Sequence, residues 1–155
     1  MKKYLKILLF VIIGCFLFNS CTRFEEGGYY SESKLCKKWK IDKVLYNGTE
    51  YNLSDYFETM LLQRGAIVEN VLCSEYTMEI RKDGTIRYYD MHIEFDMSNE
   101  HFNTDYYGTK KEDRWIFTYK EFYIGRDKLK IIKLTKDEFW YQEYDNTIFK
   151  FKAKK

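Results

Sequence analysis

The chain has 155 residues, of which 32% are charged, and a formal net charge of +2 at pH 7. Residues 1–20 contain three lysines and no acidic residue, so the rest of the chain has a formal charge of −1. This near-neutral balance, with no basic cluster except four lysines at the C-terminal end, leads us to expect no binding to nucleic acid. Aromatic residues make up 19% of the chain and favour β-strands, whereas the absence of proline excludes proline-rich linkers.

The first twenty residues are organised as a secretory signal peptide. Residues 1–6 carry the three lysines, residues 7–18 are apolar, and a short neutral segment follows. The apolar run is shorter than the roughly 20 residues that a transmembrane helix needs. Residues 17–21 (LFNSC) resemble the lipobox of bacterial lipoproteins, in which the peptide is cut before a cysteine whose sulfur carries two acyl chains. The resemblance implies a signal peptide over residues 1–20, lipid on Cys21 and an anchor that holds the protein to a membrane without spanning it.

A second cysteine competes for this role. Cys15 follows residues 12–14 (IIG) and matches the strict lipobox better residue by residue. Cleavage there would shorten the apolar run to roughly seven residues, the lower edge of what a signal peptide uses. We therefore expect lipid on Cys21, with Cys15 as the alternative.

Residues 22–33 are polar and contain glycine, which is typical of a flexible linker. Residues 21–33 are therefore interpreted as a lipidated tether, and residues 34–155 as the folded domain. Glu25 and Glu26, shortly after Cys21, resemble the acidic export signals of Bacteroidetes surface lipoproteins. We expect an outer-membrane lipoprotein, with the cell surface favoured over the periplasmic side.

Two cysteines remain inside the predicted domain, Cys36 and Cys73. An even pair in an oxidising compartment is compatible with a disulfide. Two unpaired, mostly buried thiols are the alternative, because the geometry of a disulfide cannot be derived from sequence.

In the first part of the domain, the sequence pattern predicts a strand and then a helix. Residues 38–46 (KWKIDKVLY) alternate between apolar and polar, as in a half-buried strand, and a turn follows. Ser54 is placed to cap a short helix from Asp55 to about Arg64, which Gly65 ends. Residues 66–73 fit either an extension of that helix or a buried extended segment.

From Ser74 onward the pattern predicts strand after strand. Residues 76–80 alternate up to Asp83-Gly84, a strong hairpin turn, and a long strand follows over residues 85–97. Its apolar parity switches between Tyr88 and Tyr89, which predicts a β-bulge. Further strands are expected over residues 114–119, 128–134, 138–144 and 147–153. Seven or eight strands with tight turns favour an antiparallel meander that closes into a barrel.

Three motifs carry a resemblance to the small lipocalin-like domains of Bacteroidetes lipoproteins. They are Leu35-x-x-x-Trp39-x-Ile41, Lys82-Asp83-Gly84-Thr85 and residues 132–139 (IKLTKDEF). The resemblance covers about Lys34 to Lys152 and implies a mainly β fold. That fold is a lipocalin-like antiparallel up-and-down β-barrel of about eight strands with one short helix after the first strand. The chain departs from the lipocalin pattern at two positions. Lys37-Lys38 stand where lipocalins have Gly-x before the tryptophan, and the last strand has no arginine to stack over the Trp39 ring. Both departures concern the residues that would close one end of the barrel.

Polar residues alternate on one face of the long strand. Asp90, His92, Glu94 and Asp96 point the same way and could present ligands to a divalent metal. The solvated face of an amphipathic strand explains the same pattern, and we favour it because metal sites gather ligands from several elements. With only two histidines and no hydrolase, metalloprotease or phosphate-loop motif, we expect no enzyme activity and no cofactor.

The aromatic residues support two binding hypotheses. Aromatic rings that point inward are candidates to line a cavity for a small hydrophobic ligand. They are chiefly Trp39, Tyr76, Tyr88, Trp115, Phe117 and Tyr141, and Tyr89 is also expected to point inward. The alternative is a core that these side chains fill. Exposed rings such as Tyr106, Tyr107, Tyr123 and Trp140 are candidates for a patch that binds a glycan or protein. We therefore expect a non-catalytic cell-envelope lipoprotein that binds a small hydrophobic ligand or an envelope component. The alternative is a surface structural or interaction module with no internal ligand.

Overall fold

The computed structural model describes residues 23–68, 70–73, 76–89, 91–97, 100–107, 112–118 and 121–155, and for residues 70, 91–97 and 100–107 it describes the backbone only. The proposed signal peptide, Cys15 and Cys21 lie outside the described residues. The helices are α2 (Glu32–Leu35) and α3 (Leu53–Gln63). The strands are β1 (Lys38–Tyr46), β2 (Thr49–Tyr51), β3 (Asn70–Cys73), β4 (Thr77–Ile80), β5 (Thr85–Tyr89), β6 (Met91–Met97), β7 (Glu100–Tyr107), β8 (Glu112–Thr118), β9 (Glu121–Ile124), β10 (Asp127–Leu134), β11 (Glu138–Gln142) and β12 (Ile148–Ala153). In the described part of the chain, neither helix has the length and apolar character needed to cross a membrane.

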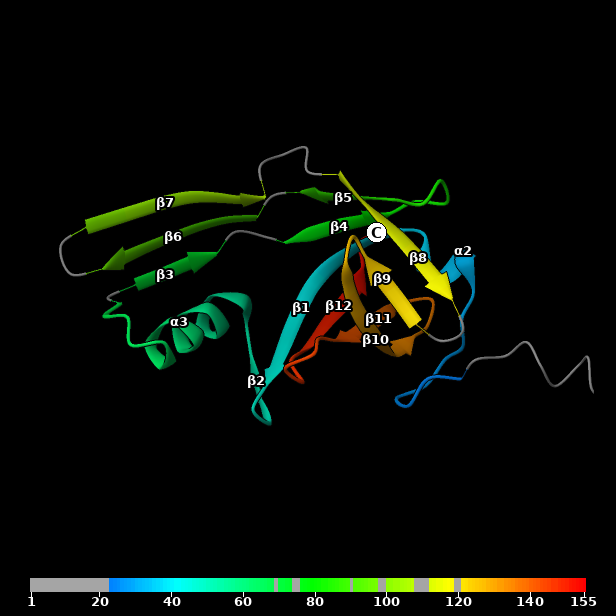
Figure 1. Ribbon diagram of the computed structural model, residues 1–155, viewed down its shortest axis with the longest axis horizontal. Coiled ribbons are helices and arrows are strands. Elements are labelled where there is room, and N and C mark those ends of the chain that lie inside the picture. The colour runs from blue at the N-terminus through cyan, green and yellow to red at the C-terminus, as the bar shows by residue number, and fades with distance from the viewer. Residues whose placement is uncertain are drawn as a thin grey trace, which may run out of the picture.

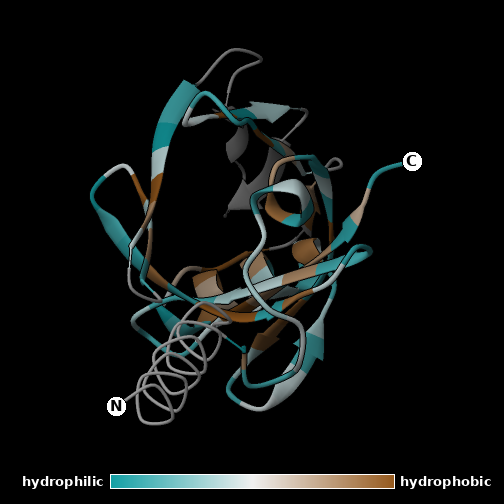
Figure 2. Cartoon of the chain, turned by 90° about the vertical axis from the view of Figure 1, so that its right-hand side faces the viewer, coloured by the Kyte–Doolittle hydropathy of each residue, from teal (hydrophilic) through white to brown (hydrophobic). Residues whose placement is uncertain are grey.

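Most of the strands form a closed antiparallel ring. Nine strands pair in the order β12-β11-β10-β9-β8-β5-β4-β1-β2, and β12 also pairs with β1. The first eight strands of that order therefore close on themselves, with β2 outside the ring (Figures 1 and 2). Closure pairs the two strands that would otherwise be exposed edges. The predicted mainly β, antiparallel, barrel-like architecture is confirmed.

Two insertions interrupt the up-and-down order of the ring. β2, α3 and β3 lie between β1 and β4, and β6 and β7 lie between β5 and β8. β3, β6 and β7 form a second, three-stranded sheet, which extends beyond the ring with α3 beside β3 (Figure 1). Its register continues that of the β4–β5 hairpin, because Cys73 pairs with Ile93 and Thr77 with Tyr89, four residues apart in each strand.

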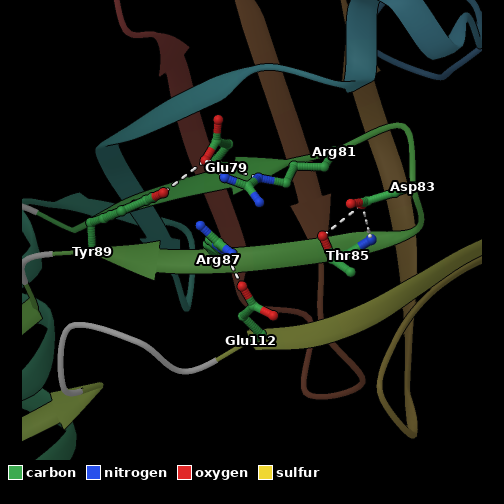
Figure 3. Close-up of polar contacts among 7 residues, drawn as sticks. All are labelled: Glu79, Arg81, Asp83, Thr85, Arg87, Tyr89 and Glu112. Atoms are coloured by element: carbon green, nitrogen blue, oxygen red, sulfur yellow. Dashed lines mark hydrogen bonds and ion pairs between the residues drawn. The ribbon is translucent and has the colours of Figure 1, made fainter.

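The predicted β-bulge does not form between Tyr88 and Tyr89; a register shift occurs instead between Met91 and Ile93, where β6 pairs with β7. Met78 pairs with Tyr88 and Thr77 with Tyr89 in unbroken register. Tyr88 is buried inside the ring, whereas the Tyr89 hydroxyl donates to Glu79 Oε2 over 2.7 Å on the outer face (Figure 3). Consecutive strand residues point to opposite faces, so only one of the two rings lines the interior.

The turn between β4 and β5 forms as predicted. Gly84 has a φ of +83°, which the turn requires and which glycine adopts without strain. Asp83 Oδ1 accepts hydrogen bonds from Thr85 N over 3.0 Å and from Thr85 Oγ1 over 2.6 Å (Figure 3). These bonds favour the ionised carboxylate and hold the pKa of Asp83 below its usual value.

Helix α3 begins two residues before the predicted start. Asn52 is the N-cap, and its side chain accepts a hydrogen bond from Asp55 N over 2.9 Å. Ser54, the predicted cap, instead accepts from Cys73 N over 2.9 Å and so connects the helix to β3. Gly65, with a φ of +82°, follows the last turn as predicted. Residues 70–73 form strand β3, so the last part of the segment 66–73 is extended and does not continue the helix.

Residues 23–31, which we name the N-terminal strap, pack against the ring. Phe24 is buried, and Gly28 forms a parallel bridge to Leu134 of β10. The Tyr30 ring stacks on Phe117 with the centroids 3.9 Å apart and the planes parallel within 1°. The described part of the expected tether is therefore packed structure, and α2 adds a short helix before the first strand that the sequence did not predict.

One end of the ring, which we name the packed end, is filled with side chains. Leu35, Trp39, Phe122, Phe139 and Phe151 are all 0% exposed. Trp39 Nε1 donates to the carbonyl oxygen of Leu35 over 2.8 Å, which connects the end of α2 to the start of β1. The ammonium group of Lys37 lies 5.3 Å from the centroid of the Trp39 ring. The filled-core alternative is therefore correct for this end.

Candidate functional site

Away from the packed end, the interior of the ring opens into two adjoining cavities. The chain at β11 shows the direction away from the packed end. Phe139 and Tyr141 share the inner face of this strand, and Glu143, just after its end, continues the same two-residue spacing. The first cavity, of about 440 Å³, is lined by Tyr46, Leu53, Tyr56, Phe57, Met60, Gln63, Arg64, Tyr76, Tyr141, Glu143, Tyr144, Asp145 and Phe149. The second, of about 350 Å³, is lined by Tyr76, Tyr88, Ile124, Arg126, Asp127, Lys128, Leu129, Tyr141, Glu143 and Tyr144.

The two cavities share four lining residues, Tyr76, Tyr141, Glu143 and Tyr144, and together they form the candidate site. We name it the tyrosine mouth, defined by Glu143 and the six tyrosines of the two linings: Tyr46, Tyr56, Tyr76, Tyr88, Tyr141 and Tyr144. Tyrosine offers an apolar ring face together with a hydroxyl, so this lining can contact both the apolar body and the polar groups of a ligand.

Strand residues build one wall of the tyrosine mouth. Tyr141 stacks on Phe149 with centroids 5.4 Å apart, and on Phe151 of the packed end at 5.6 Å. Tyr76 and Tyr88 lie nearly parallel, with centroids 6.0 Å apart and an interplanar angle of 11°. Because each ring packs against another ring, the wall is fixed before any ligand arrives.

Helix α3 builds the opposite wall. Tyr56 and Met60 lie four residues apart and therefore share the helix face that lines the first cavity, and Arg64, the C-cap residue, follows them in the same lining. Tyr56 meets Tyr46 edge to face, with centroids 5.5 Å apart. The Tyr46 hydroxyl donates to Gln63 Oε1 over 2.6 Å, which connects the end of β1 to the last turn of the helix.

Glu143 is the titratable group at the centre of the tyrosine mouth. Burial, with smaller contributions from the nearby carboxylates of Asp145 and Asp127, raises its pKa to about 7. Among the described residues, no hydrogen bond or ion pair reaches its side chain. Burial also raises the pKa of Tyr56 to about 12, with contributions from Glu143 and Asp145, so its hydroxyl stays neutral at physiological pH.

Three of the six rings predicted to line a ligand cavity do line these two. They are Tyr76, Tyr88 and Tyr141. Trp39 belongs to the packed end instead. Trp115 donates its Nε1 hydrogen to the carbonyl oxygen of Arg81 over 2.8 Å, and Phe117 lies against the N-terminal strap.

Sequence reasoning missed Glu143 and the helical wall. The signal for Glu143 was present, since it shares strand parity with the inward Phe139 and Tyr141. The signal for Tyr56 was also present as an apolar helix face, but only the fold shows that this face covers the open end of the ring.

Cys36 and Cys73 are free thiols, so the disulfide alternative is not realised in this structure. Cys36 lies beside the packed end, where Lys37 O accepts from Ile80 N. Cys73 in β3 precedes Ile80 in β4 by seven residues, which corresponds to roughly 20 Å between the two residues at the usual rise of a strand. A disulfide needs α-carbons within about 7 Å. Burial raises the pKa of both thiols to about 11.

The remaining candidate residues lie elsewhere. Asp90 is outside the described residues, and of His92 and Glu94 only the backbone, in β6, is described. Among the side chains that the structure describes, no three potential ligands converge on a metal-binding position.

The candidate surface rings do not form one patch among the described side chains. The ring of Trp140 lies between the ammonium groups of Lys133 and Lys150, at 4.3 and 4.4 Å from its centroid. Tyr123 is half-buried and its hydroxyl donates to Glu121 Oε2 over 2.5 Å. For Tyr106 and Tyr107 only the backbone is described.

Aliphatic side chains that the sequence did not single out are exposed near α3. Leu62 is 50%, Ile67 70% and Leu72 55% exposed. Comparison of the chain with protein-family models, with curated proteins and with solved structures found no match.

Proposed function

We propose that this chain is a cell-envelope lipoprotein whose lipocalin-like barrel binds a small, largely apolar molecule in the tyrosine mouth. The observation that carries the proposal is the contrast between the two ends of the ring. One end is filled by side chains that are 0% exposed, and the other holds adjoining cavities of about 440 and 350 Å³. Sites for small molecules are commonly apolar cavities of about 300–1,000 Å³ with a few polar groups.

The lipid anchor is part of this proposal and rests on the lipobox-like residues 17–21. Phe24 is packed on the ring, and Cys21 is three residues before it in the sequence. Three residues of extended chain span at most about 10 Å. Acyl chains on Cys21 would therefore hold the barrel close to the outer membrane, with Cys15 as the alternative position. Mass spectrometry of the mature N-terminal peptide tests this, and a peptide that retains residues 16–20 would contradict lipid on Cys21.

Binding rather than catalysis is proposed because, among the described residues, the linings of the two cavities contain no serine, threonine, cysteine or histidine side chain. A hydrolase that uses such a nucleophile would need it with a base beside it. The two histidines of the chain belong to β6 and β7, in the sheet outside the ring.

Binding is tested with N-phenyl-1-naphthylamine, a neutral apolar probe that fluoresces when it leaves water. We expect saturable binding to the mature protein. Met60→Trp, which places a larger side chain into the first cavity, should weaken binding at least tenfold. Ile116→Trp is the matched control, because Ile116 is 61% exposed on β8 and lines neither cavity. Absence of saturable binding, or equal affinity of both variants, would contradict the proposal.

A surface interaction module is the second candidate function. The exposed side chains of Leu62 in α3, of Ile67 shortly after that helix and of Leu72 in the neighbouring β3 favour it, because exposed apolar surface is used for contacts with partners. This alternative predicts co-purification with a defined envelope protein or glycan. Ile67→Ser should abolish that co-purification, whereas Met60→Trp should leave it unchanged.

A further inference from the structure

Glu143 is the one carboxyl group that lines both cavities of the tyrosine mouth. Its side chain is half-buried and has no hydrogen bond or ion pair within the described part of the chain. Removing a carboxylate from water without a partner is costly. The protein therefore holds, at the point where its two cavities meet, a group whose charge is uncompensated whenever it is ionised.

The charged groups around Glu143 increase this negative potential. Asp145 follows it in the β11–β12 hairpin, and Asp127 begins β10 across the second cavity. Both carboxylates disfavour the charge on Glu143 and thus raise its pKa. The positive groups of the two linings are Arg64 on the α3 side and Arg126 and Lys128 on the β9–β10 side. Arg64 and Arg126 are exposed, and Lys128 pairs with Glu121.

Aromatic rings surround the same point. Tyr56 from α3, Tyr76 just before β4 and Tyr141 from β11 approach it from three directions, with Tyr46 and Tyr144 at the rim. The face of an aromatic ring carries partial negative charge and attracts cations. The hydroxyl of Tyr56 stays neutral because burial raises its pKa to about 12.

Resting on the ligand binding proposed above, we propose that the tyrosine mouth takes an organic cation, with its nitrogen beside Glu143 and its apolar body against the tyrosine rings. Such a ligand carries a protonated or quaternary amine on an apolar or aromatic body. It supplies the missing counter-charge, whereas a neutral ligand leaves the carboxylate unpaired and an anion adds repulsion. A bare metal ion would leave the apolar walls unused.

The proposal implies a pH dependence. Glu143 must be ionised to pair with the cation, and burial raises its pKa to about 7. For a quaternary amine, whose own charge does not change with pH, affinity should rise on the order of tenfold between about pH 5.5 and 8.5. A neutral ligand should show no such rise.

The test compares three compounds that share a phenylbutyl body and differ in the head group: trimethylammonium, hydroxyl or carboxylate. Isothermal titration on the mature protein at pH 8 should rank the ammonium compound first by at least tenfold, because its positive charge is attracted both by the Glu143 carboxylate and by the faces of the aromatic rings. Glu143→Gln should remove this preference and its pH dependence while the hydroxyl compound binds as before. Glu112→Gln is the matched control, because Glu112 pairs with Arg87 on the outer face of the ring and lines neither cavity (Figure 3).

The outcomes separate this inference from the proposed function. If N-phenyl-1-naphthylamine binds but the three compounds bind equally, or not at all, the tyrosine mouth binds ligands without preferring cations and the inference is overturned. An unchanged ammonium preference in Glu143→Gln also overturns it. If neither the naphthylamine nor any of the three compounds binds, the proposed function itself fails. Retained affinity of Glu143→Gln for the hydroxyl compound shows that the variant is folded.

Discussion

Replacing Gly28 with alanine should release the N-terminal strap from β10. A β-carbon at Gly28 would lie 1.8 Å from the carbonyl oxygen of Leu134 and 2.6 Å from its carbonyl carbon. Both are backbone atoms, which cannot rotate away as a side chain can. Gly27 is the matched control, because it also has a positive φ, of +110°, but a β-carbon there would have nothing within 4 Å.

The cost of Gly28→Ala is limited by the interactions that hold the strap, since the strap can detach instead of accepting the clash. Burial of Phe24 contributes about 1.5–3 kcal/mol. Two backbone hydrogen bonds between the strap and β10, of 3.0 and 3.2 Å, contribute about 0.5–1.5 kcal/mol each. The stack of Tyr30 on Phe117 contributes about 0.5–1.5 kcal/mol. After the entropy regained by the freed residues, the free energy of unfolding should fall by about 2–4 kcal/mol.

Gly27→Ala should cost about 1–2 kcal/mol, which is the strain of a side chain at a positive φ. Urea denaturation compares the two variants, and amide hydrogen exchange locates the change. In Gly28→Ala the amides of Glu26 and Leu134 should lose protection, because they donate the two bonds between the strap and β10, while amides around Trp39 keep theirs. Equal stability of the two variants, with the strap amides still protected, would refute the close packing of Gly28 on β10.

Three further predictions test the interior of the barrel. Between about pH 4.5 and 8, the free energy of unfolding of the wild-type protein should fall by about 1–2 kcal/mol more than that of Glu143→Gln. The reason is that burial raises the pKa of Glu143 to about 7, so the folded state binds more protons than the unfolded state. Urea titrations measure the difference, and parallel curves for the two proteins would contradict it. Trp39→Phe should cost about 2–3 kcal/mol in thermal or urea unfolding, through a lost hydrogen bond and poorer packing, whereas the half-buried Trp140→Phe should cost under about 1 kcal/mol. Alkylation under denaturing, non-reducing conditions should label both Cys36 and Cys73, whereas unlabelled, linked peptides would show a disulfide. In the native protein at pH 8 both thiols should react slowly, because burial raises the pKa of each to about 11.

Local patterns in the sequence predicted local structure well. The turn at Asp83-Gly84 and the end of the helix at Gly65 both form as expected, since each depends on the backbone preference of a few neighbouring residues. The predicted cap at Ser54 was displaced to Asn52 because Ser54 accepts a hydrogen bond from β3, an element nineteen residues away. A pattern among neighbouring residues cannot show a hydrogen-bond partner that lies in another strand.

Patterns that were read across a longer stretch were less reliable. The parity switch at Tyr88 and Tyr89 was interpreted as a bulge, whereas Tyr89 is simply an aromatic residue on the outer face that pairs with Glu79. The polar composition of residues 22–33 indicated a linker, yet Phe24 within it is buried. A single apolar side chain can hold a polar segment to a barrel when an apolar surface lies within reach.

The sequence by itself determined that the chain is mainly β, that its strands follow one another through tight turns, and that rings such as Tyr76 and Tyr141 face inward. These properties follow from the two-residue period of a strand and from turn residues. Only the tertiary structure decided that Trp39 fills one end of the ring, that Tyr141 lines the open end, and that Glu143 there has no hydrogen bond or ion pair with the side chains that the structure describes. The reason is that ring closure between β1 and β12 and the docking of α3 bring together residues distant in the sequence, and the pattern of one strand carries no information about its partners.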